Sequence, residues 1–429
     1  MYKTHKLMNR IILIGNGFDL AHGLPTSYWD FINWYWSEWQ IRLINSEKKI
    51  EEDALCSFSM ASDDKCFKDF IKRFKSQLEY KSQSEFFNNL ARISTCVKEA
   101  CTYLDHICKA VKTKGWVDIE NEYYKLLKFS IEKERVNSHK IKVDILNQQL
   151  EFLKNKLIEY LSSINIEDNL RNDLIREIIY SPIKHRDIAV SCTDKLVEHI
   201  QNELTRRDED FLMKMEVYNY KYNYYQLLNG LRKEQDSNVE LIQTKILSNE
   251  YPNEFLLPNE IMFLNFNYTN TAKLYLPTPK PGFEINHIHG ELSNPESVIF
   301  GYGDELDENY KKLSNLNDNE YLKNFKSIKY LESDRYRKAL QFMDAAPYQV
   351  FIMGHSCGNS DRTFLNTLFE HKNCVSIKPY YYKDGDKDNY LDIIQNISRN
   401  FKDMKLMRDR VVNKTYCEPF SVKEPDTND

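Results

Sequence analysis

The sequence predicts an α/β protein in which both ends of the chain build one mostly parallel sheet, with a large α-helical insertion between them. Three observations predict this fold. The aliphatic residues 11–14 form a short buried strand that ends in a glycine turn. Only two glycines lie between residues 24 and 281 and only one proline between 26 and 251, so this span should be mostly helical. Beyond residue 255, several apolar runs end in glycine or small polar residues, as strands of a parallel sheet do.

The positions of these glycines and prolines also set the expected domain boundaries. Residues 1–45 and 255–415 should form a discontinuous nucleotide-binding α/β domain, residues 46–254 the helical insertion, and residues 416–429 a C-terminal tail. A chain of 429 residues is long enough for two or three compact units, which fits this division.

The first strand leads into the turn Gly15-Asn16-Gly17-Phe18-Asp19. Two glycines let the backbone adopt unusual conformations and bring amide N–H groups close to an anion, so this turn is a candidate phosphate-binding loop. The carboxylate of Asp19 stands where it could hold a ribose hydroxyl. The simpler interpretation is an ordinary tight turn.

Two helices of the N-terminal half can be argued from single residues. Ser27 and Asp30 have the spacing of a capping pair at a helix start. Phe31, Tyr35 and Trp39 follow at four-residue intervals and form one bulky stripe that could cover the sheet. A second helix carries an apolar seam at three- and four-residue spacing, made of Val143, Leu146, Leu150, Leu153, Leu157 and Tyr160.

The C-terminal strands each deliver polar residues. Residues 261–266 are a strand that ends at Asn267, residues 285–288 carry His287 and lead to His289, residues 298–300 lead to two glycines, and residues 350–353 lead to Gly354. Ligands bind outside the carboxyl ends of strands in open parallel sheets, so these side chains are candidate site residues. The competing interpretation is that the asparagines and Asp361 cap helices and that the histidines are ordinary turn residues.

Two common nucleotide-binding patterns are not present. A hydride-transferring Rossmann domain needs a third glycine three residues after Gly17, and Leu20 occupies that position. No Gly-Lys-Ser/Thr follows any glycine loop, which excludes a P-loop.

The stretch GNGFDLAHGLPTSYWDF at residues 15–31 resembles the opening of the AbiH family, bacterial proteins linked to abortive infection against phage. Further segments fit the same family and together cover about a third of the chain: 116–120 with Trp116, Asp118 and Glu120, 264–271, 287–290, 300–304, and 354–361. Asp118 and Glu120 either begin a helix or, as their place in the family resemblance implies, approach the ligand pocket. The order of these motifs is similar to that of sirtuin-like NAD-binding domains, which implies a Rossmann-like sheet.

That resemblance implies a site and an activity. Asn267 and His289 would match the catalytic Asn and His beside the nicotinamide–ribose bond, with His287 competing for the role of base. Gly15 to Asp19 would match the turn that meets the phosphates and ribose. Gly354, Ser356 and Asp361 would match the segment that holds the adenosine end. The implied activity is hydrolysis of NAD⁺ as substrate. Asn16, Asp19 and Thr269 depart from the sirtuin pattern, which puts the substrate in doubt more than the fold.

Composition restricts the location and the partners. The net charge of −5 makes a nucleic-acid partner unlikely, and no apolar stretch is long enough for a membrane span. Nine cysteines without a Cys-x-x-Cys pair are typical of reduced thiols in a cytoplasm, and they predict no metal site. The expected partner is a nucleotide, and a phage protein as trigger and a homo-oligomer are both compatible with the sequence.

Two alternatives to an NAD⁺-consuming enzyme stay open. The same fold could sense a nucleotide or bind a partner without catalysis, as the departures from the sirtuin pattern suggest. An RNA-cleaving toxin could instead use the histidines and nearby acids, although the acidic balance of the chain weakens this hypothesis.

Overall fold

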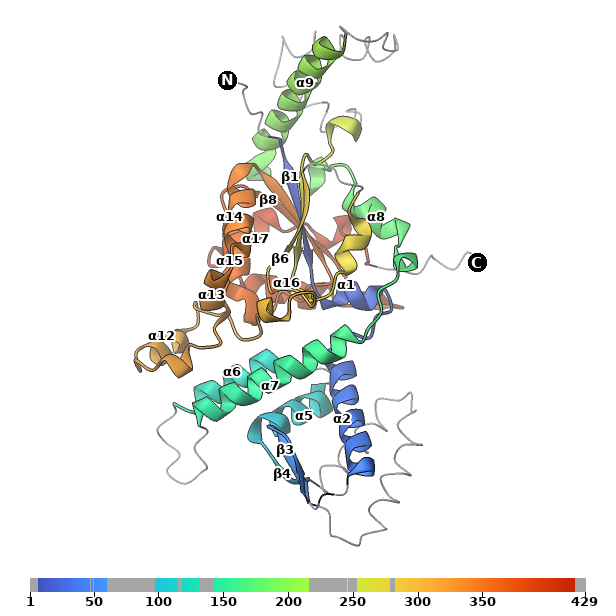
Figure 1. Cartoon of the computed structure of the whole chain (residues 1–429). Coiled ribbons are helices and arrows are strands. Elements are labelled where there is room, and N and C mark those ends of the chain that lie inside the picture. Colours follow the sequence, from blue (N-terminus) through green and yellow to red (C-terminus); the bar gives the residue numbers. More distant parts are fainter. Residues whose placement is uncertain are drawn as a thin grey trace. The chain divides into compact units, whose positions relative to one another are not determined.

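The fold is taken from a computed structural model (Figure 1), which describes residues 7–46, 48, 50–59, 97–114, 118–131, 142–215, 245, 253–277 and 282–420. The chain divides into two compact units. Unit 1 contains residues 1–23, 166–291 and 330–429, and unit 2 contains residues 24–165 and 292–329. These ranges differ from the expected 1–45 and 255–415 for the sheet domain. The segment 24–45 belongs to unit 2, and the segment 166–254 belongs to unit 1.

Unit 1 is built on a five-stranded, fully parallel sheet with the strand order β6-β5-β1-β7-β8. Its strands are β1 (Asn9–Ile14), β5 (Ile261–Asn265), β6 (Phe283–His287), β7 (Tyr348–Met353) and β8 (Cys374–Tyr380). Counted along the chain, this order is third, second, first, fourth, fifth. The order therefore reverses at β1, so the connections on its two sides run in opposite directions across the sheet.

The first strand occupies the centre of this sheet. Ile11 is paired with Met262 of β5 on one side and with Val350 of β7 on the other. All six residues of β1 are buried. A central parallel strand is covered on both faces, which is why Ile11 to Ile14 form an apolar run rather than an alternation. The polar Asn9 and Arg10 at the start of the strand are buried as well.

Helices cover both faces of the sheet. Figure 1 shows α14 (Arg335–Ala345) and α15 (Arg362–Glu370) on one side of it and α8 (Asp173–Ile179) on the other. Ile175 and Ile179 of α8 pack with Ile12 and Ile14 of β1 in one buried cluster. The remaining elements of unit 1 are α1 (Asn16–Ala21), α9 (Thr193–Met215), α16 (Tyr390–Arg399), α17 (Met404–Arg410) and the small hairpin of β9 (Lys383–Asp384) and β10 (Lys387–Asp388).

Strand β8 was not predicted from the sequence, because its apolar pattern is interrupted by a lysine and a proline. Lys378 is 1% exposed, and its Nζ lies 3.1 Å from Asp187 Oδ2 and 2.8 Å from Glu418 Oε2. A buried ammonium is tolerated only when such partners neutralise it. Pro379 lies in the last strand of the sheet, where a missing N–H leaves no ladder bond on the open side.

Unit 2 contains residues 46–165 of the expected insertion together with residues 24–45 and 292–329 from outside it, and it has a sheet that was not expected. Its helices are α2 (Tyr28–Asn45), α5 (Thr102–Lys114), α6 (Ile119–Phe129), α7 (Val143–Ser162), α12 (Glu308–Ser314) and α13 (Lys326–Lys329). The unexpected sheet is three-stranded and antiparallel, and it consists of β2 (Ile50–Glu52), β3 (Cys56–Ser59) and β4 (Val97–Ala100). The scarcity of glycine and proline therefore did not exclude strands from this region.

The two helices argued from single residues are present. Ser27 and Asp30 form a complete capping box at the start of α2, and the predicted seam of α7 is buried along its whole length. The aromatic stripe of α2 packs within unit 2, whereas the parallel sheet that it was expected to cover belongs to unit 1. Within unit 2, Phe31 packs against Tyr160 of α7, and Trp39 packs against Phe58 of β3.

One predicted strand is absent. Residues 298–300 are buried in unit 2 but form no strand. Gly301, which follows them, explains the irregular path: a Cβ at this position would lie 2.1 Å from the carbonyl oxygen of Asn324. The segment therefore runs against a loop instead of joining a ladder.

Candidate functional site

The carboxyl ends of β5, β1 and β7 lie side by side in unit 1, and most of the predicted site residues follow these strand ends. The strand order reverses at β1, which is the position where open α/β sheets place their ligands. Two groups of polar residues lie there. One surrounds Asp19 on the β1 and β5 side, and the other surrounds Asp361 on the β7 side.

A seam of three glycines joins the turn after β1 to the turn after β7. The Gly17 N–H donates to the Gly354 carbonyl oxygen at 2.8 Å. Gly354 has φ +77°, and a Cβ there would lie 2.0 Å from the amide nitrogen of Phe18. A Cβ on Gly15 would likewise meet the His355 backbone at 2.5 Å. The glycines are thus required for close approach of two backbone segments.

This seam also uses the amides that the sequence suggested for phosphate. Gly15 N–H donates to the Met353 carbonyl at 3.3 Å, and Phe18 N–H donates to the Gly15 carbonyl at 2.9 Å. Together with the Gly17 bond, three amides of the turn already have acceptors within the protein. Asn16, the first residue of α1, is exposed.

Asp19 is buried, at 1% exposure, on the inner side of α1. Its Oδ2 accepts a hydrogen bond from the Thr269 hydroxyl at 2.5 Å. Burial raises the pKa of Asp19 from 3.8 to about 6, although the side chains of Thr269, Thr271 and Asn267 oppose the rise. Its Oδ1 has no hydrogen-bond partner among the described residues. Burial of the Asp19 carboxyl therefore costs folding free energy, because only neutral groups form its hydrogen bonds.

The asparagine predicted as catalytic lies on the same side. Asn267 Nδ2 donates to the Gly15 carbonyl at 3.0 Å, and its backbone N–H donates to Asn265 Oδ1 at 2.9 Å. His287 lies close by, with Nδ1 3.3 Å from Asn265 Nδ2, and burial lowers its pKa. These contacts tie Asn267 to the glycine turn and surround His287 with amides.

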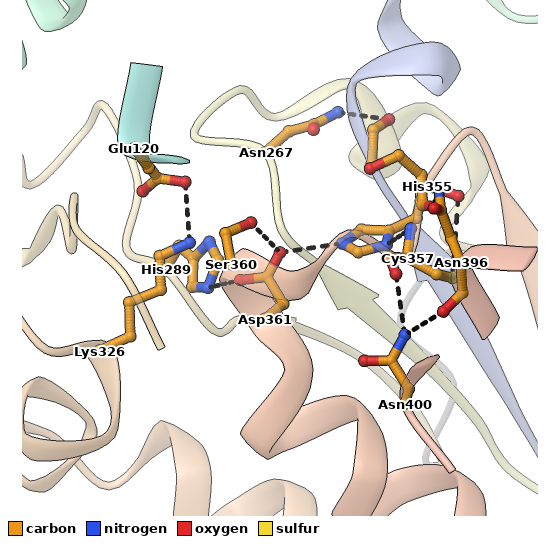
Figure 2. A network of polar contacts seen from close by, with 12 residues as sticks. Glu120, Asn267, His289, Lys326, His355, Cys357, Ser360, Asp361, Asn396 and Asn400 are labelled. Atoms are coloured by element: carbon orange, nitrogen blue, oxygen red, sulfur yellow. Dashed lines mark hydrogen bonds and ion pairs between the residues drawn. The ribbon is translucent and has the colours of Figure 1, made fainter. Parts of the chain in front are cut away.

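The second group centres on Asp361, whose carboxylate lies between two imidazoles (Figure 2). His289 Nε2 is 3.3 Å from Asp361 Oδ1, and His355 Nε2 is 3.5 Å from Oδ2. The exposed fractions of the three side chains are between 5% and 10%. Three elements that are separate in sequence bring these residues together: the turn after β6, the turn after β7 and the start of α15.

A backbone hydrogen bond to His355 indicates which ring nitrogen carries the proton. Its Nδ1 accepts the Cys357 N–H at 3.0 Å, so this nitrogen carries no proton. The proton of the neutral ring is then on Nε2, which faces Asp361. The Nε2–H of His355 therefore points toward Asp361 Oδ2, and His289 Nε2 faces the other oxygen of the same carboxylate.

Aromatic rings enclose His289. The Phe266 ring stands edge-on to it with centroids 4.8 Å apart, and the Tyr330 ring stacks on it at 6.1 Å. The Tyr330 hydroxyl is 3.2 Å from His289 Nε2. Phe364 of α15 packs against both aromatic rings. Such an apolar surround lowers the local dielectric and strengthens the imidazole–carboxylate interaction.

The structure distinguishes between several interpretations that the sequence left open. Asp361 precedes α15 but makes no capping bond, so its carboxylate serves the histidines instead. The side chain of Asn270 makes no capping bond either. Asp118 caps α6 through Asn121 N–H, which is the helix-start interpretation. Ser356 is exposed, and its carbonyl accepts a bond from Asn396.

Glu120 is part of the core of unit 2. Its Oε2 is 2.9 Å from Lys326 Nζ, and its Oε1 accepts the Gly301 N–H at 2.9 Å. Both ion-pair partners are buried. Trp116, the neighbour predicted with it, lies outside the described residues.

Sequence reasoning missed His355, although it stands inside the quoted Gly-His-Ser segment. The signal was available: a histidine directly after the glycine that ends a buried strand occupies the same kind of position as His289. Tyr330 could not have been found, because it lies in a helical stretch that carries no motif.

Within the described parts of the chain, no helix is long and apolar enough to cross a membrane. In the same parts, no group of three or more His, Cys, Asp or Glu side chains has the arrangement of a metal site. The seven cysteines that are described are free thiols.

The parallel sheet defines an α/β protein. Its polar residues gather at the carboxyl edge near β1, where the strand order reverses and where open α/β sheets place their ligands. The family model described as "Bacteriophage abortive infection AbiH" matches residues 11–382, and the chain belongs to this family. Membership implies a role in abortive infection against phage. No curated protein and no solved structure matches the chain.

Proposed function

We propose that this AbiH protein hydrolyses NAD⁺ at the nicotinamide–ribose bond, with His289 as the base and Asp361 as the residue that positions it. One observation carries the proposal: a buried carboxylate holds two imidazoles at the carboxyl edge of a parallel sheet whose strand order is 3-2-1-4-5. That strand order is shared with dinucleotide-binding domains, which bind their ligands where the order reverses.

The chemistry needs little acid catalysis. Nicotinamide leaves the cationic ribosyl pyridinium as a neutral molecule when the C–N bond breaks, and water adds its oxygen to the anomeric carbon. His289 takes the proton that this water, or a ribose hydroxyl, gives up. Asp361 then faces an imidazolium and stabilises it, as the buried carboxylate of a catalytic triad does. The products are ADP-ribose, nicotinamide and a proton.

Asn267 is assigned an orienting role. Its amide does not change charge, and it is tied to the glycine turn through the Gly15 carbonyl. An amide held in this way can align the attacking water or the ribose. We assign Gly15 to Asp19 and the segment from Gly354 to Asp361 to contacts with the remaining parts of the dinucleotide.

The test is incubation of the purified full chain with NAD⁺, with release of nicotinamide as the readout. We expect His289→Ala and Asp361→Asn each to lower the rate at least 100-fold, and Asn267→Ala at least 10-fold, with unchanged thermal unfolding. The matched control is His371→Ala. His371 also faces an aspartate, Asp344, at 3.3 Å, but it precedes β8 and so lies at the opposite edge of the sheet. Unchanged turnover in His289→Ala would refute the assignment.

A second candidate function is a nucleotide sensor or partner-binding module without turnover. The observation that favours it is the glycine seam, because the amides of Gly15, Gly17 and Phe18 already donate to backbone carbonyls. Tight binding of NAD⁺ or ATP without products would support this candidate. Cleavage of total RNA in a parallel reaction would instead support an RNA-degrading toxin.

A further inference from the structure

A separate cavity of about 330 Å³ lies in unit 1, beside the edge strand β6. Arg171 and Arg176 stand on one part of its wall, and Tyr180, Tyr275, Leu276 and Phe283 form much of the rest. Phe283 begins β6, whereas His289 follows the other end of that strand. At about 3.3 Å per residue, the two places are about 15–20 Å apart along β6. The cavity is therefore not the site around Asp361.

The charge of this cavity is positive. No aspartate or glutamate is among the described residues that line it. Arg171 contacts one carboxylate, Asp173 at 3.8 Å, and both side chains are exposed, at 44% and 83%, so this pair competes weakly with a ligand. Among the residues that the structure describes, none forms an ion pair with Arg176. Two guanidinium groups that face one cavity favour a phosphate, which they can bind with paired hydrogen bonds.

Apart from the two arginines, the lining residues are aromatic or aliphatic. The Tyr180 and Phe283 rings are in contact, with centroids 5.9 Å apart, and Leu274 and Leu276 pack beside them against the core. Aromatic surfaces of this kind bind planar rings by stacking. The volume of this cavity, about 330 Å³, is near the lower end of the range for ligand cavities. It suits a small molecule and is too small for a dinucleotide.

The aromatic wall is held rigidly in place. The Tyr180 hydroxyl donates to the Tyr275 carbonyl at 2.6 Å, and the Tyr275 hydroxyl accepts the Asn172 N–H at 3.0 Å. The same hydroxyl is 2.6 Å from His22 Nε2. A wall fixed by three hydrogen bonds needs little ordering when a ligand enters, which favours affinity.

We propose that this cavity binds a mononucleotide, with its phosphate on Arg171 and Arg176 and its base against Tyr180 and Phe283. The proposal does not depend on NAD⁺ hydrolysis, and it assigns the protein a second ligand of a different size class.

Calorimetric titration of the full chain with AMP, GMP, CMP and UMP tests the proposal. We expect at least one of the four to bind with a dissociation constant below 1 mM, a ΔG of at least about 4 kcal/mol in magnitude. Adenosine and inorganic phosphate should each bind at least tenfold more weakly than the best mononucleotide, because each supplies only half of the contacts. Binding of none of the four would overturn the proposal.

Variants locate the binding. Arg171→Gln combined with Arg176→Gln should weaken the mononucleotide at least tenfold, and the Lys substitutions, which keep the charge but not the paired bonds, should weaken it less. Arg408→Gln, on the exposed face of α17, is the matched control and should bind as the wild type. His289→Ala should also retain binding. Loss of binding in His289→Ala but not in the double variant would place the ligand at the other site and refute the proposal.

Discussion

The two sides of the carboxyl edge in unit 1 each bury one aspartate, but they surround it with opposite chemistry. Asp19 meets hydroxyl and amide groups, and burial raises its pKa to about 6. Asp361 meets two imidazoles, one of which accepts the Cys357 N–H at its other ring nitrogen. A carboxyl among neutral groups costs stability when it ionises, whereas one beside a histidine can support a positive charge.

Under the proposed function, this difference separates the side that binds and orients the ligand from the side that transfers the proton. Asp19 and its neighbours hold the glycine turn against the strand ends, and burial lowers the pKa of the nearby His22 and His287. The Asp361 side holds two imidazoles against one buried carboxylate, an arrangement that general acid–base catalysis uses. The glycine seam joins the two sides, so changes there should have the largest effect.

The largest effect on stability is expected from a substitution that disrupts the glycine seam. Gly354→Ala places a Cβ 2.0 Å from the Phe18 nitrogen and 2.4 Å from the Gly17 carbonyl carbon, in a backbone with φ +77°. The left-handed conformation alone costs about 1–2 kcal/mol, and the backbone clash should bring the total loss of unfolding free energy above about 4 kcal/mol.

Chemical denaturation measures this loss, and Gly385→Ala is its matched control. Gly385 also has positive φ, +55°, but a Cβ there meets nothing within 4 Å. It should therefore lose only about 1 kcal/mol. Similar stability for both variants would show that the two turns do not depend on close backbone contact.

The pH dependence of stability should distinguish the two aspartates. Asp19 has a folded-state pKa of about 6, above its ordinary value of 3.8, so the folded protein holds this proton more tightly than the unfolded chain. Its contribution is fully present below about pH 4 and is lost as the pH rises through 6. The loss amounts to about 3 kcal/mol.

The comparison that isolates this effect is the wild type against Asp19→Asn. Going from pH 4 to pH 7, we expect the wild type to lose about 2–3 kcal/mol of unfolding free energy relative to the variant. A constant difference between wild type and Asp19→Asn at the two pH values would contradict the raised pKa.

Much of unit 1 follows from local sequence signals. The aliphatic run before Gly15, the strand before Asn267 and the strand before Gly354 were all predicted near their observed places. Such runs are informative because a central parallel strand must be apolar on both faces. In unit 2, the capping box at Ser27 was also predictable, because it depends only on two residues that are three positions apart in the sequence.

The parts that were not predicted depend on distant partners. Strand β8 contains Lys378, which is acceptable only because Asp187 and Glu418 lie beside it. The stripe of α2 could be recognised as buried, but its partner Tyr160 could not be chosen from the sequence. In the site, Asp361 was predicted, yet its contact with His355 requires the fold that brings two turns together.

The smallest effect is expected from the neutral hydrogen bonds on the Asp19 side. His22 Nδ1 donates to the Phe18 carbonyl at 2.7 Å, and burial lowers the pKa of His22, so its Nε2 is free of a proton and accepts the Tyr275 hydroxyl. Tyr275→Phe leaves Nε2 and the Asn172 N–H without this partner. The loss of unfolding free energy should be about 2 kcal/mol.

Denaturation at pH 7 provides the measurement, and Tyr382→Phe, whose ring is 62% exposed, provides the control with no expected change. The size of the loss bears on the contrast between the two sides. If Tyr275→Phe destabilised the protein as much as Gly354→Ala, the hydrogen bonds rather than the glycine seam would hold the turn. A loss near 2 kcal/mol would keep Tyr275→Phe below Gly354→Ala in its effect on unfolding free energy. A neutral hydrogen bond contributes little beyond what water would supply, whereas solvent cannot relieve a backbone clash.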